Sequence, residues 1–461
     1  MKSIVDPQGA LSRGLAGIRS RFQIPATFPA DVLSLASAAA NRTITGHADW
    51  TDRPFVTLDP LASTDLDQAF AIERDGSDLI LQYAIADVPS FAAERDAIDL
   101  EAWRRGTTIY LPDGKASLYP PLLSEGAASL LPNVDRPAVV FTVRINEAGK
   151  SSLDAAVRAM IRSRAKLGYE TVRQSDLPAD FEELSNRIDQ AEDARGAERV
   201  DAPEQELVEN PDGRFVLEFR TELQAEKQNA ALSLAANLAI ADALFAHKTG
   251  LFRVMAPPDQ AAIGRLHHSA KALGLVWPRH RTLAQFERTL DHDNPKHAAF
   301  RSAILRAGSK AGYAPYVEGV TPWHSAMAAT YAHATAPLRR LADRYVIEAA
   351  LQIASGKDVS DDLTEAFEQL PAVMARAEAR AGQIQRATLD LAQAVTLEGR
   401  EKTCFDAVVT DVDDRGTRIQ LADPAVVARI DGQGAMPGDR IKVELVKVDV
   451  DHGQIGFQRA G

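Results

Sequence analysis

Residues 57–70 read TLDPLASTDLDQAF and place three aspartates, Asp59, Asp65 and Asp67, within nine positions. Asp65 and Asp67 lie two residues apart on a segment predicted to be extended, so their side chains project toward the same face. Asp59 precedes Pro60 at the end of a predicted strand, and the intervening loop can bring it beside the other two. Carboxylates this close repel one another, so the stretch predicts a cation that holds them together.

Oxygen ligands alone favour Mg²⁺, with Mn²⁺ as the alternative, over zinc. A magnesium site that takes only some ligands from protein takes the rest from water and substrate phosphates. A metal in that setting activates water and shields a leaving oxygen. The aspartates therefore point to phosphodiester or phosphoryl cleavage, and the alternative for this stretch alone is a structural cation loop or a solvated turn.

A second stretch, residues 331–346, reads YAHATAPLRRLADRYV. We predict that a helix opens near Thr335 and carries Arg339 and Arg340 in its first turn. The helix dipole does not favour cations at that end. An external anion is therefore expected, and a hydroxyl with two guanidinium groups would clamp a phosphate. The alternative is a surface helix on which Asp343 pairs with an arginine.

Composition is that of a soluble globular protein: the chain has 461 residues, 45% of them hydrophobic and 25% charged. The longest apolar run, residues 230–245, is interrupted by Asn237 and Asp242, which favours a buried core helix over a membrane span. A single cysteine, Cys404, excludes an internal disulfide and leads us to expect a cytoplasmic protein. The net charge of −12 argues against indiscriminate polyanion binding but leaves room for a local basic channel.

Three regions are predicted, and together they make an α+β protein. Residues 1–50 have helical spacing and suggest a small domain of the helix-turn-helix kind. Residues 51–400 combine strands with long helices in a mixed α/β domain, and the acidic stretch 176–213 within it is interpreted as a solvated helix and loop. Residues 401–461 contain five short strands, which fit a closed barrel of the OB type. A purely stabilising cap is the alternative for this tail.

The two motifs together resemble the ribonuclease II family of exoribonucleases, which also includes ribonuclease R. The family signatures are T-[IL]-D-P-x-x-A-x-D-x-D-D-A and Y-x-x-x-T-S-P-[IL]-R-R-Y-x-D, and this chain has TLDPLASTDLDQA and YAHATAPLRRLAD. Smaller echoes stand in the expected order, among them HADWTDRPFVTLD, YAIADV, IYLPDGKASLYPPLLSEGAASLLP and IRSRAKLGYETV. The resemblance covers roughly residues 20–400, and the tail resembles the family's RNA-binding domain of the ribosomal-protein S-one type.

The resemblance implies processive, divalent-metal-dependent 3′→5′ hydrolysis of single-stranded RNA to nucleoside 5′-monophosphates. By position, it makes Asp59 the direct metal ligand and Asp67 the residue most needed for catalysis, and Arg339 stabilises charge on the scissile phosphate. The implied catalytic residues are Asp59, Asp65, Asp67 and Arg339, and the implied metal ligands are Asp59, Asp65, Asp67 and Gln68. The implied RNA-binding residues are Tyr110, which stacks on the 3′-terminal base, Phe252 as its partner across that base, Tyr331, Thr335, Arg339, Arg340 and Gln385.

Three departures from the family pattern bear on activity. Gln68 stands where the family has a fourth aspartate, so metal affinity is expected to fall or Mn²⁺ to be preferred. Gln385 and Arg386 stand where the family has Glu-Arg, which puts a contact to the terminal nucleotide in doubt. The family's paired N-terminal cold-shock domains do not fit into about 50 residues, so weaker RNA affinity with steep salt dependence is expected.

Two classes of function remain open on the sequence. The first is the exoribonuclease, expected to be a monomer that takes single-stranded RNA 3′ end first and needs no membrane. The alternative is an RNA-binding protein on the same fold with attenuated catalysis, which Gln68 and Gln385 motivate. Against that alternative, the central charges Asp59, Asp65, Asp67 and Arg339 are all present.

Overall fold

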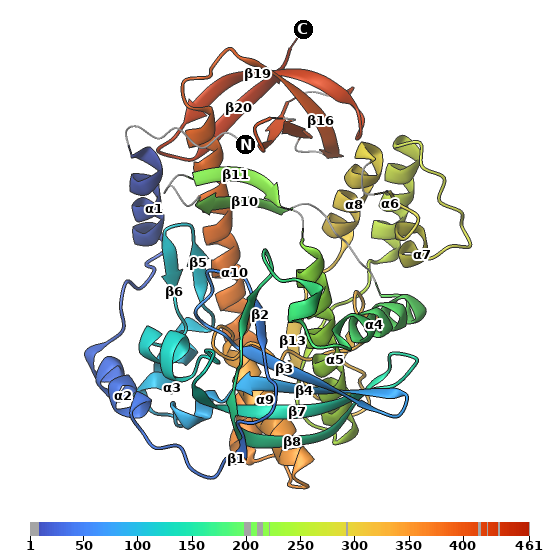
Figure 1. The fold of residues 1–461 in the computed structure, drawn as a ribbon. Helices are drawn as coiled ribbons and strands as arrows, with labels where there is room; N and C mark the ends of the chain where they lie inside the picture. The colour runs from blue at the N-terminus through green and yellow to red at the C-terminus, as the bar shows by residue number, and fades with distance from the viewer. Residues whose placement is uncertain are drawn as a thin grey trace.

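The structure is a computed structural model, and it describes residues 9–197, 204–209, 215–220, 222–291, 294–413, 416–421, 423–431 and 434–460. A five-stranded sheet lies at one end of the molecule and a closed five-stranded barrel at the other (Figure 1). This arrangement confirms the predicted α+β fold with a mixed α/β domain followed by an OB-type barrel.

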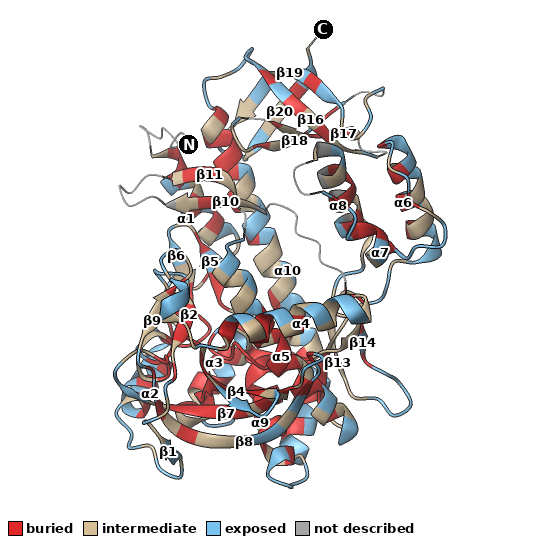
Figure 2. Ribbon diagram, turned by 45° about the vertical axis from the view of Figure 1, so that its right-hand side comes forward, coloured by how far each residue is buried: buried red, intermediate tan, exposed pale blue. Residues whose placement is uncertain are grey.

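The sheet has the strand order β1-β8-β7-β4-β3. Its strands are β1 (Ala48–Trp50), β3 (Gln68–Asp75), β4 (Asp78–Ala86), β7 (Asp135–Ile145) and β8 (Ser151–Arg162). All pairings are antiparallel except that of β1 with β8. The apolar residues of β4 and β7 are buried almost without a break, because helices cover the sheet (Figure 2).

Helix α5 (Gln224–Ala246) packs on the sheet together with α9 (Leu341–Ala354) and α4 (Phe181–Arg195). By length and composition α5 has the character of a membrane span, but 61% of its most apolar window is buried inside the protein. It is therefore the core helix that the sequence predicted. Phe181 of α4 stacks on Phe70 of β3, with ring centroids 5.5 Å apart.

Helix α10 (Asp361–Leu397) runs from the sheet to the barrel (Figure 1). Its 37 residues span about 55 Å at the usual rise per residue. Leu370 and Met374 near its start belong to the core of the sheet, whereas Leu391 and Val395 near its end belong to a second core shared with the barrel. One helix therefore joins both halves of the molecule.

The barrel closes in the order β16-β17-β18-β20-β19. Its strands are β16 (Cys404–Asp413), β17 (Gly416–Leu421), β18 (Val427–Ile430), β19 (Arg440–Asp449) and β20 (Gln454–Arg459). The remaining strands form pairs: β2 (Thr57–Asp59) with β9 (Lys166–Gly168), β5 (Ile109–Leu111) with β6 (Gly114–Ala116), β10 (Glu204–Glu209) with β11 (Phe215–Arg220), β12 (Leu251–Val254) with β13 (Gly312–Pro315), and β14 (Trp323–His324) with β15 (Ala329–Thr330).

Three helices between β12 and β13 form a small bundle with its own core beside the barrel (Figure 2). They are α6 (Gln260–Ala272), α7 (Leu283–Glu287) and α8 (Pro295–Ala307). Trp277 is the centre of that core and stacks on His267 and Phe286. The other short elements are α3 (Ala97–Arg105), η1 (Val88–Ser90), η2 (Leu123–Ala127) and η3 (Gln174–Asp176).

The N-terminal helices differ from the predicted helix-turn-helix module. Residues 1–8 lie outside the described residues; beyond them α1 (Ala10–Arg21) and α2 (Ala30–Ala40) form as expected. However, Leu11 and Leu15 of α1 pack in the core shared by α10 and the barrel, whereas Val32 and Ala36 of α2 pack in the core of the sheet. Each helix therefore extends an existing core, and the two do not share one of their own.

The acidic stretch 176–213 also differs from its interpretation as a solvated helix and loop. Residues 198–203 and 210–213 of it lie outside the described residues. Helix α4 buries Phe181, Leu184 and Ile188, and the β10–β11 hairpin packs Leu207 and Leu217 against the barrel end of α10. Its charges thus lie on elements that also carry an apolar face.

Candidate active site

The three predicted aspartates line one pocket of about 620 Å³. Asp59 ends β2, and Asp67 directly precedes β3, so the intervening loop returns the chain to the edge of the sheet. Seven of the eleven predicted site residues line this pocket, namely Asp59, Asp65, Asp67, Gln68, Tyr110, Tyr331 and Arg339. Residues 280 positions apart in the chain, Asp59 and Arg339, are thereby brought to one place.

Asp67 is buried and is held by the second motif. Its Oδ1 atom accepts a hydrogen bond from the backbone N–H of Leu338 at 2.7 Å, and its Oδ2 atom accepts one from Arg339 Nε at 3.2 Å. Burial raises the pKa of Asp67 to about 7, although Arg339 and the Leu338 N–H act in the opposite direction. Asp67 therefore orients the guanidinium group of Arg339.

Asp65 is held at the rim of the pocket by two side chains from the β5–β6 hairpin. Lys115 Nζ lies 2.7 Å from its Oδ1 atom, and the hydroxyl of Tyr110 donates to its Oδ2 atom at 3.2 Å. Lys115 also pairs with Glu125 at 3.3 Å. Because the hydroxyl of Tyr110 is tied to Asp65 while the residue stays 55% exposed, its ring is presented to the pocket.

Asp59 differs from the other two carboxylates. Its Oδ2 atom is buried and has no hydrogen-bond partner among the described residues. Burial raises the pKa of Asp59 to about 6, and the charge of Asp65 contributes in the same direction. A buried carboxylate oxygen without a donor is costly, and a cation is the partner that would satisfy it.

One carboxylate oxygen of this donor set is available to a divalent cation, whereas the other carboxylates already accept hydrogen bonds. The orphan oxygen of Asp59 suits an oxygen-preferring ion. The oxygens of Asp65 and Asp67 already accept hydrogen bonds, and no group of three His, Cys, Asp or Glu side chains within the described ranges is gathered closely enough to hold a metal. The hydroxyl of Tyr83 donates to Gln68 Oε1, so that oxygen also has a partner. Asp59 is accordingly the first ligand that an ion would find.

Four predicted RNA-binding residues take other positions. Phe252 is fully buried and packs edge-to-face on Phe245 in the core, so stacking on a base is wrong for it. Thr335 is buried with its hydroxyl 2.9 Å from Ser233 Oγ, not offered to a phosphate. Arg340 forms a two-pronged ion pair with Asp343, so an arginine pairs with Asp343 as the alternative proposed, but α9 is largely buried and is not the surface helix of that alternative.

Gln385 is the fourth of these residues. It is exposed on α10 and does not line the pocket. Its neighbour Ile384 is buried in the core shared by α10 and the barrel. The helix that begins after Arg340 also starts later than predicted, since α9 opens at Leu341.

The sequence interpretation missed several residues of the pocket wall. Tyr169 and Asn229 lie beside Asp59, and Asn229 Nδ2 donates to Tyr169 Oη at 2.9 Å and to the Leu58 carbonyl at 3.1 Å. Tyr169 lies in GYETV, the end of one of the stretches that carry the family resemblance, so the sequence could have identified it as a candidate. Acidic residues from α4, from the start of α5 and from the residues just before it also line the pocket, and they are Asp189, Glu192, Glu222 and Glu226.

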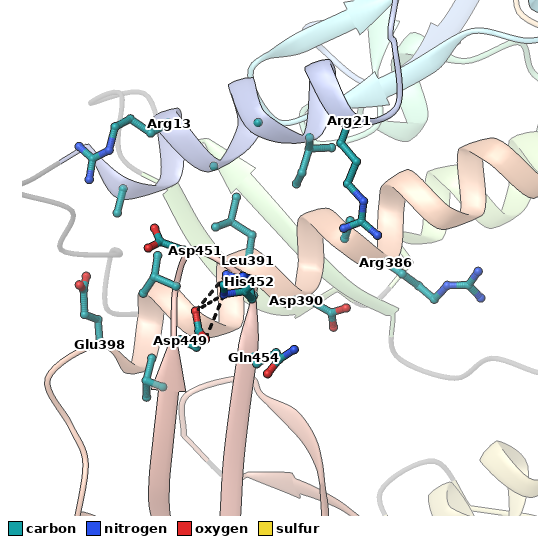
Figure 3. A pocket seen from close by; sticks show the side chains of 18 of the residues that line it. Arg13, Arg21, Arg386, Asp390, Leu391, Glu398, Asp449, Asp451, His452 and Gln454 are labelled. Carbon is teal, nitrogen blue, oxygen red and sulfur yellow. Dashed lines mark hydrogen bonds and ion pairs between the residues drawn. The ribbon is translucent and has the colours of Figure 1, made fainter.

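A larger hollow of about 1450 Å³ lies between α1, α10 and the turn that joins β19 to β20 (Figure 3). His452 in that turn contacts the carboxylate of Asp449 at 2.9 Å. Both signs of charge line the hollow, from Arg13, Arg21, Arg386 and Lys447 to Asp390, Glu398, Glu401, Asp449 and Asp451. None of the eleven predicted site residues lines it.

Comparison with curated proteins gives distant relatives over nearly the whole chain. Ribonuclease R of Aquifex aeolicus is 25% identical over 491 residues, which cover 95% of this chain and 69% of the relative. Ribonuclease R of Escherichia coli is 26% identical over 490 residues, which cover 94% of this chain and 60% of the relative. The chain thus spans between 60% and 69% of the length of these two relatives.

Solved structures share the fold. Mycoplasma genitalium RNase R in complex with ribose methylated single-stranded RNA has a TM-score of 0.86 and 20% identity, covering 100% of this chain and 79% of that one. Yeast Ssd1, a pseudonuclease, has a TM-score of 0.68 and 14% identity, covering 96% of this chain and 59% of that one. A nuclease and a pseudonuclease therefore both match this fold, so the fold alone does not separate the two classes of function.

Family models match both halves of the molecule. The RNB domain matches residues 47–353, which contain the sheet and the pocket. The RNase II-type exonuclease C-terminal S1 domain matches residues 404–460, which form the barrel. The chain therefore belongs to the RNB-domain family of RNase II-type exoribonucleases.

Proposed function

We propose that this protein is a divalent-metal-dependent 3′→5′ exoribonuclease that degrades single-stranded RNA processively to nucleoside 5′-monophosphates. The observation that carries the proposal is the convergence, in one pocket, of the orphan Asp59 oxygen, the Asp67–Arg339 pair and the exposed Tyr110 ring. RNA would enter 3′ end first. A cytoplasmic monomer that uses Mg²⁺ or Mn²⁺ is part of the proposal.

The carboxylates would hold the cation, with Asp59 as the first ligand and Asp65 and Asp67 beside it. When bound, the ion would supply an activated water and neutralise charge at the leaving oxygen. Arg339 uses Nε for Asp67, and its side chain is 45% exposed, so the outer guanidinium nitrogens face the space where a phosphate would lie. Fixed donors of this kind stabilise the charge that develops on a scissile phosphate.

Tyr110 would set the position of the terminal nucleotide. Its hydroxyl is fixed by Asp65, which leaves the ring in one orientation. Stacking of a base on an aromatic ring contributes about 1–3 kcal/mol and does not depend on the base. An RNA 3′ end stacked there would lie in the same pocket as Asp59 and Arg339, as removal of one nucleotide at a time requires.

The second candidate is an RNA-binding protein with attenuated catalysis. Gln68 favours it, because the amide brings no charge and its oxygen accepts from Tyr83. The shared fold with a pseudonuclease is compatible with it. The intact set of Asp59, Asp65, Asp67 and Arg339 favours the enzyme, since an RNA binder has no need of a buried carboxylate without a donor.

The test uses single-stranded RNA labelled at the 5′ end, with the full chain in Mg²⁺, in Mn²⁺ and in EDTA. We expect a ladder that shortens from the 3′ end and releases mononucleotides in either metal, and no product in EDTA or from Asp67→Asn. Gln68→Asp is the matched variant at the departing position and should raise activity at low metal concentration. Binding without shortening, at the same level in wild type and Asp67→Asn, would establish the RNA binder instead.

A further inference from the structure

The segment from Ala334 to Arg340 brings two donors to Asp67, the Leu338 N–H and the Arg339 guanidinium. It belongs to neither a helix nor a strand, since α9 begins only at Leu341. A segment without regular structure must obtain its shape from other groups, because each of its backbone N–H groups needs a partner when buried. The partners of this segment are therefore the groups that fix the site.

Two buried side chains satisfy its first N–H groups. Asn237 Oδ1 accepts from the Ala334 N–H at 2.9 Å. Asp343 Oδ2 accepts from the Thr335 N–H at 3.0 Å and from the Ala336 N–H at 2.9 Å. Pro337 has no N–H, so the next donor in the chain is the Leu338 N–H, which points at Asp67.

The other side of the segment is hydrogen-bonded to residues 106–108, which directly precede β5, the strand that carries Tyr110. The Arg339 carbonyl accepts from the Thr108 N–H at 3.0 Å and from the Thr107 hydroxyl at 2.8 Å. The Leu341 N–H donates to the Gly106 carbonyl at 3.0 Å. The position of Arg339 is thereby coupled to that of Tyr110, which follows two residues after Thr108 on β5.

Asn237 and Asp343 are shielded from solvent and lie on α5 and α9, two helices that pack in the core of the sheet. Asn237 of α5 is 2% exposed and Asp343 of α9 is 0% exposed, and neither lines the pocket. Arg340 neutralises the Asp343 charge with two hydrogen bonds, at 3.0 and 2.7 Å. The desolvation of a buried ion pair is offset when further hydrogen bonds use the remaining acceptor capacity of the carboxylate, as the Thr335 and Ala336 N–H groups do here.

We propose that Asn237 and Asp343 are positioning residues, which hold residues 334–338 in the path that delivers the Leu338 N–H and Arg339 to Asp67 and to the scissile phosphate. The proposal rests on the proposed function for its kinetic consequence, but its structural part is independent of activity. Neither residue touches RNA. A displacement of about 1 Å at such a site lowers a rate by about 100-fold, so the rate of the chemical step should depend on both residues.

The main variant is Asp343→Asn, and Asp99→Asn is its matched control. Asp99 is also a buried aspartate, 1% exposed, that pairs with an arginine of α9, Arg344, at 2.7 Å and accepts a backbone N–H from Arg95 at 2.8 Å. It makes no contact with the segment that carries Arg339 among the described residues. Each variant therefore removes a buried carboxylate charge that is paired with an arginine, Asp343 on α9 and Asp99 on α3, and only Asp343 is hydrogen-bonded to the segment that carries Arg339.

We expect Asp343→Asn to lower kcat about 10- to 100-fold while the Kd for RNA changes less than about twofold. Asp99→Asn should lower the Tm to a similar degree and leave kcat per folded molecule unchanged. Asn237→Leu, which keeps the branching at Cγ but removes the acceptor of the Ala334 N–H, should reproduce the loss of kcat. If Asp343→Asn and Asn237→Leu lower the Tm but leave kcat per folded molecule unchanged, as Asp99→Asn should, both residues are merely structural and the proposal is overturned.

Amide hydrogen exchange over residues 334–341 gives a readout that needs no RNA cleavage. Protection of these amides should fall at least about tenfold in Asp343→Asn and Asn237→Leu and stay at the wild-type level in Asp99→Asn. Unchanged protection in the first two variants would overturn the proposal. If wild-type protein does not cleave RNA yet the exchange result is as expected, the proposed function fails while the positioning role stands.

Discussion

At the scale of single residues, Asp59 and Asp67 are the groups whose chemistry depends most on their surroundings. Burial raises the pKa of Asp59 to about 6 and that of Asp67 to about 7. Both carboxyl groups therefore bind a proton more readily than an exposed aspartate does. The oxygens of Asp67 accept hydrogen bonds from Leu338 and Arg339, whereas the Asp59 Oδ2 atom accepts none from the described residues.

The raised pKa of Asp59 predicts how the stability of the metal-free protein depends on pH. The folded state binds a proton that the unfolded state releases near pH 4, so the free energy of unfolding falls as pH rises from about 4 through about 6. Asp59→Asn should therefore be more stable than wild type in EDTA at pH 8, with less difference at pH 4. Mg²⁺ should raise the Tm of wild type at pH 8 but not that of Asp59→Asn. Equal stabilisation of both proteins by Mg²⁺ in thermal melts would contradict the role of Asp59.

Tyr110 offers a second residue-scale prediction, because its ring and its hydroxyl have separate tasks. Tyr110→Phe removes the hydrogen bond to Asp65 and keeps the ring, whereas Tyr110→Ala removes both. We expect Tyr110→Phe to leave the limit product unchanged. Tyr110→Ala should alter its length and weaken binding of a short RNA by about 1–3 kcal/mol. Gel analysis of the end products checks this, and identical end products from the two variants would count against stacking.

The residues of the candidate site were only partly predictable from sequence. The aspartates and Arg339 could be found because their motifs place like charges at close spacing, and such spacing has few structural uses. Thr335 and Arg340 belong to the same motif, yet their side chains turn inward to Ser233 and Asp343. Phe252 is also buried. These three residues could not be predicted correctly because spacing along a chain does not specify which side of a loop or strand faces the pocket.

At the scale of elements, the α6–α8 bundle stands out by charge. Residues 256–310 contain nine Lys and Arg against four Asp and Glu, a net charge of +5 in a chain of −12. Six exposed cations of the bundle have no ion-pair partner within the described part of the chain: Arg265, Lys271, Arg279, Arg281, Lys296 and Lys310. The bundle therefore carries a local excess of exposed positive charge on an acidic protein.

The double variant Arg279→Ala/Arg281→Ala tests whether the bundle contacts RNA phosphates. We expect weaker binding of long RNA and a salt slope, log Kd against log salt concentration, reduced by about 1–2. Arg162→Ala is the control, because Arg162 is also exposed but pairs with Asp135 at 2.7 Å. Fluorescence anisotropy at several salt concentrations gives the slopes. A slope that is the same in the double variant and in wild type would exclude the bundle as a phosphate contact.

The packing of α1 on α10 gives a prediction with a built-in control. A Cβ atom at Gly14 would lie 2.5 Å from the methyl groups of Leu391, whereas one at Gly17 would meet nothing within 4 Å. Gly17→Ala should stabilise the protein by up to about 1 kcal/mol through helix propensity. Gly14→Ala should lose that gain and cost about 1–3 kcal/mol through the clash. Denaturant titration distinguishes them, and equal effects would mean that α1 does not dock on α10 as described.

Elements were more predictable than their partners. The five barrel strands and the core helix α5 carry apolar patterns long enough to read directly. The β10–β11 hairpin could not be predicted in this way, because β10 contains only two apolar residues among charged and polar ones. Leu207 and Leu217 become informative only once α10 and the barrel are present to receive them. The same holds for α1 and α2, whose apolar faces did not reveal that each would join a different core.

At the scale of the whole molecule, Gln393 connects three parts that are distant in sequence. This buried residue of α10 accepts the Val427 N–H of the barrel at 2.7 Å and the side-chain amide of Gln205 in β10 at 3.1 Å. Gln205 also donates to the Ala425 carbonyl at 2.6 Å. Because α10 contributes to both cores, these bonds should make the barrel and the RNB domain unfold together.

Gln393→Ala should therefore uncouple the two halves. It leaves the Val427 N–H without its acceptor and removes one of the two acceptors of the Gln205 amide, which destabilises the joint between barrel and helix by about 1–3 kcal/mol. We expect the single calorimetric transition of wild type to split, with a component at lower temperature from the barrel. Cleavage of a short RNA that reaches only the pocket should persist, whereas binding of a long RNA should weaken.

Gln369→Ala is the control, because Gln369 is exposed on the same helix and, among the described residues, donates only to Glu365 at 3.0 Å. If Gln393→Ala melts in one transition like Gln369→Ala, the barrel is held by its apolar contact with α10 alone, and the polar joint has no part in keeping an RNA aligned from barrel to pocket.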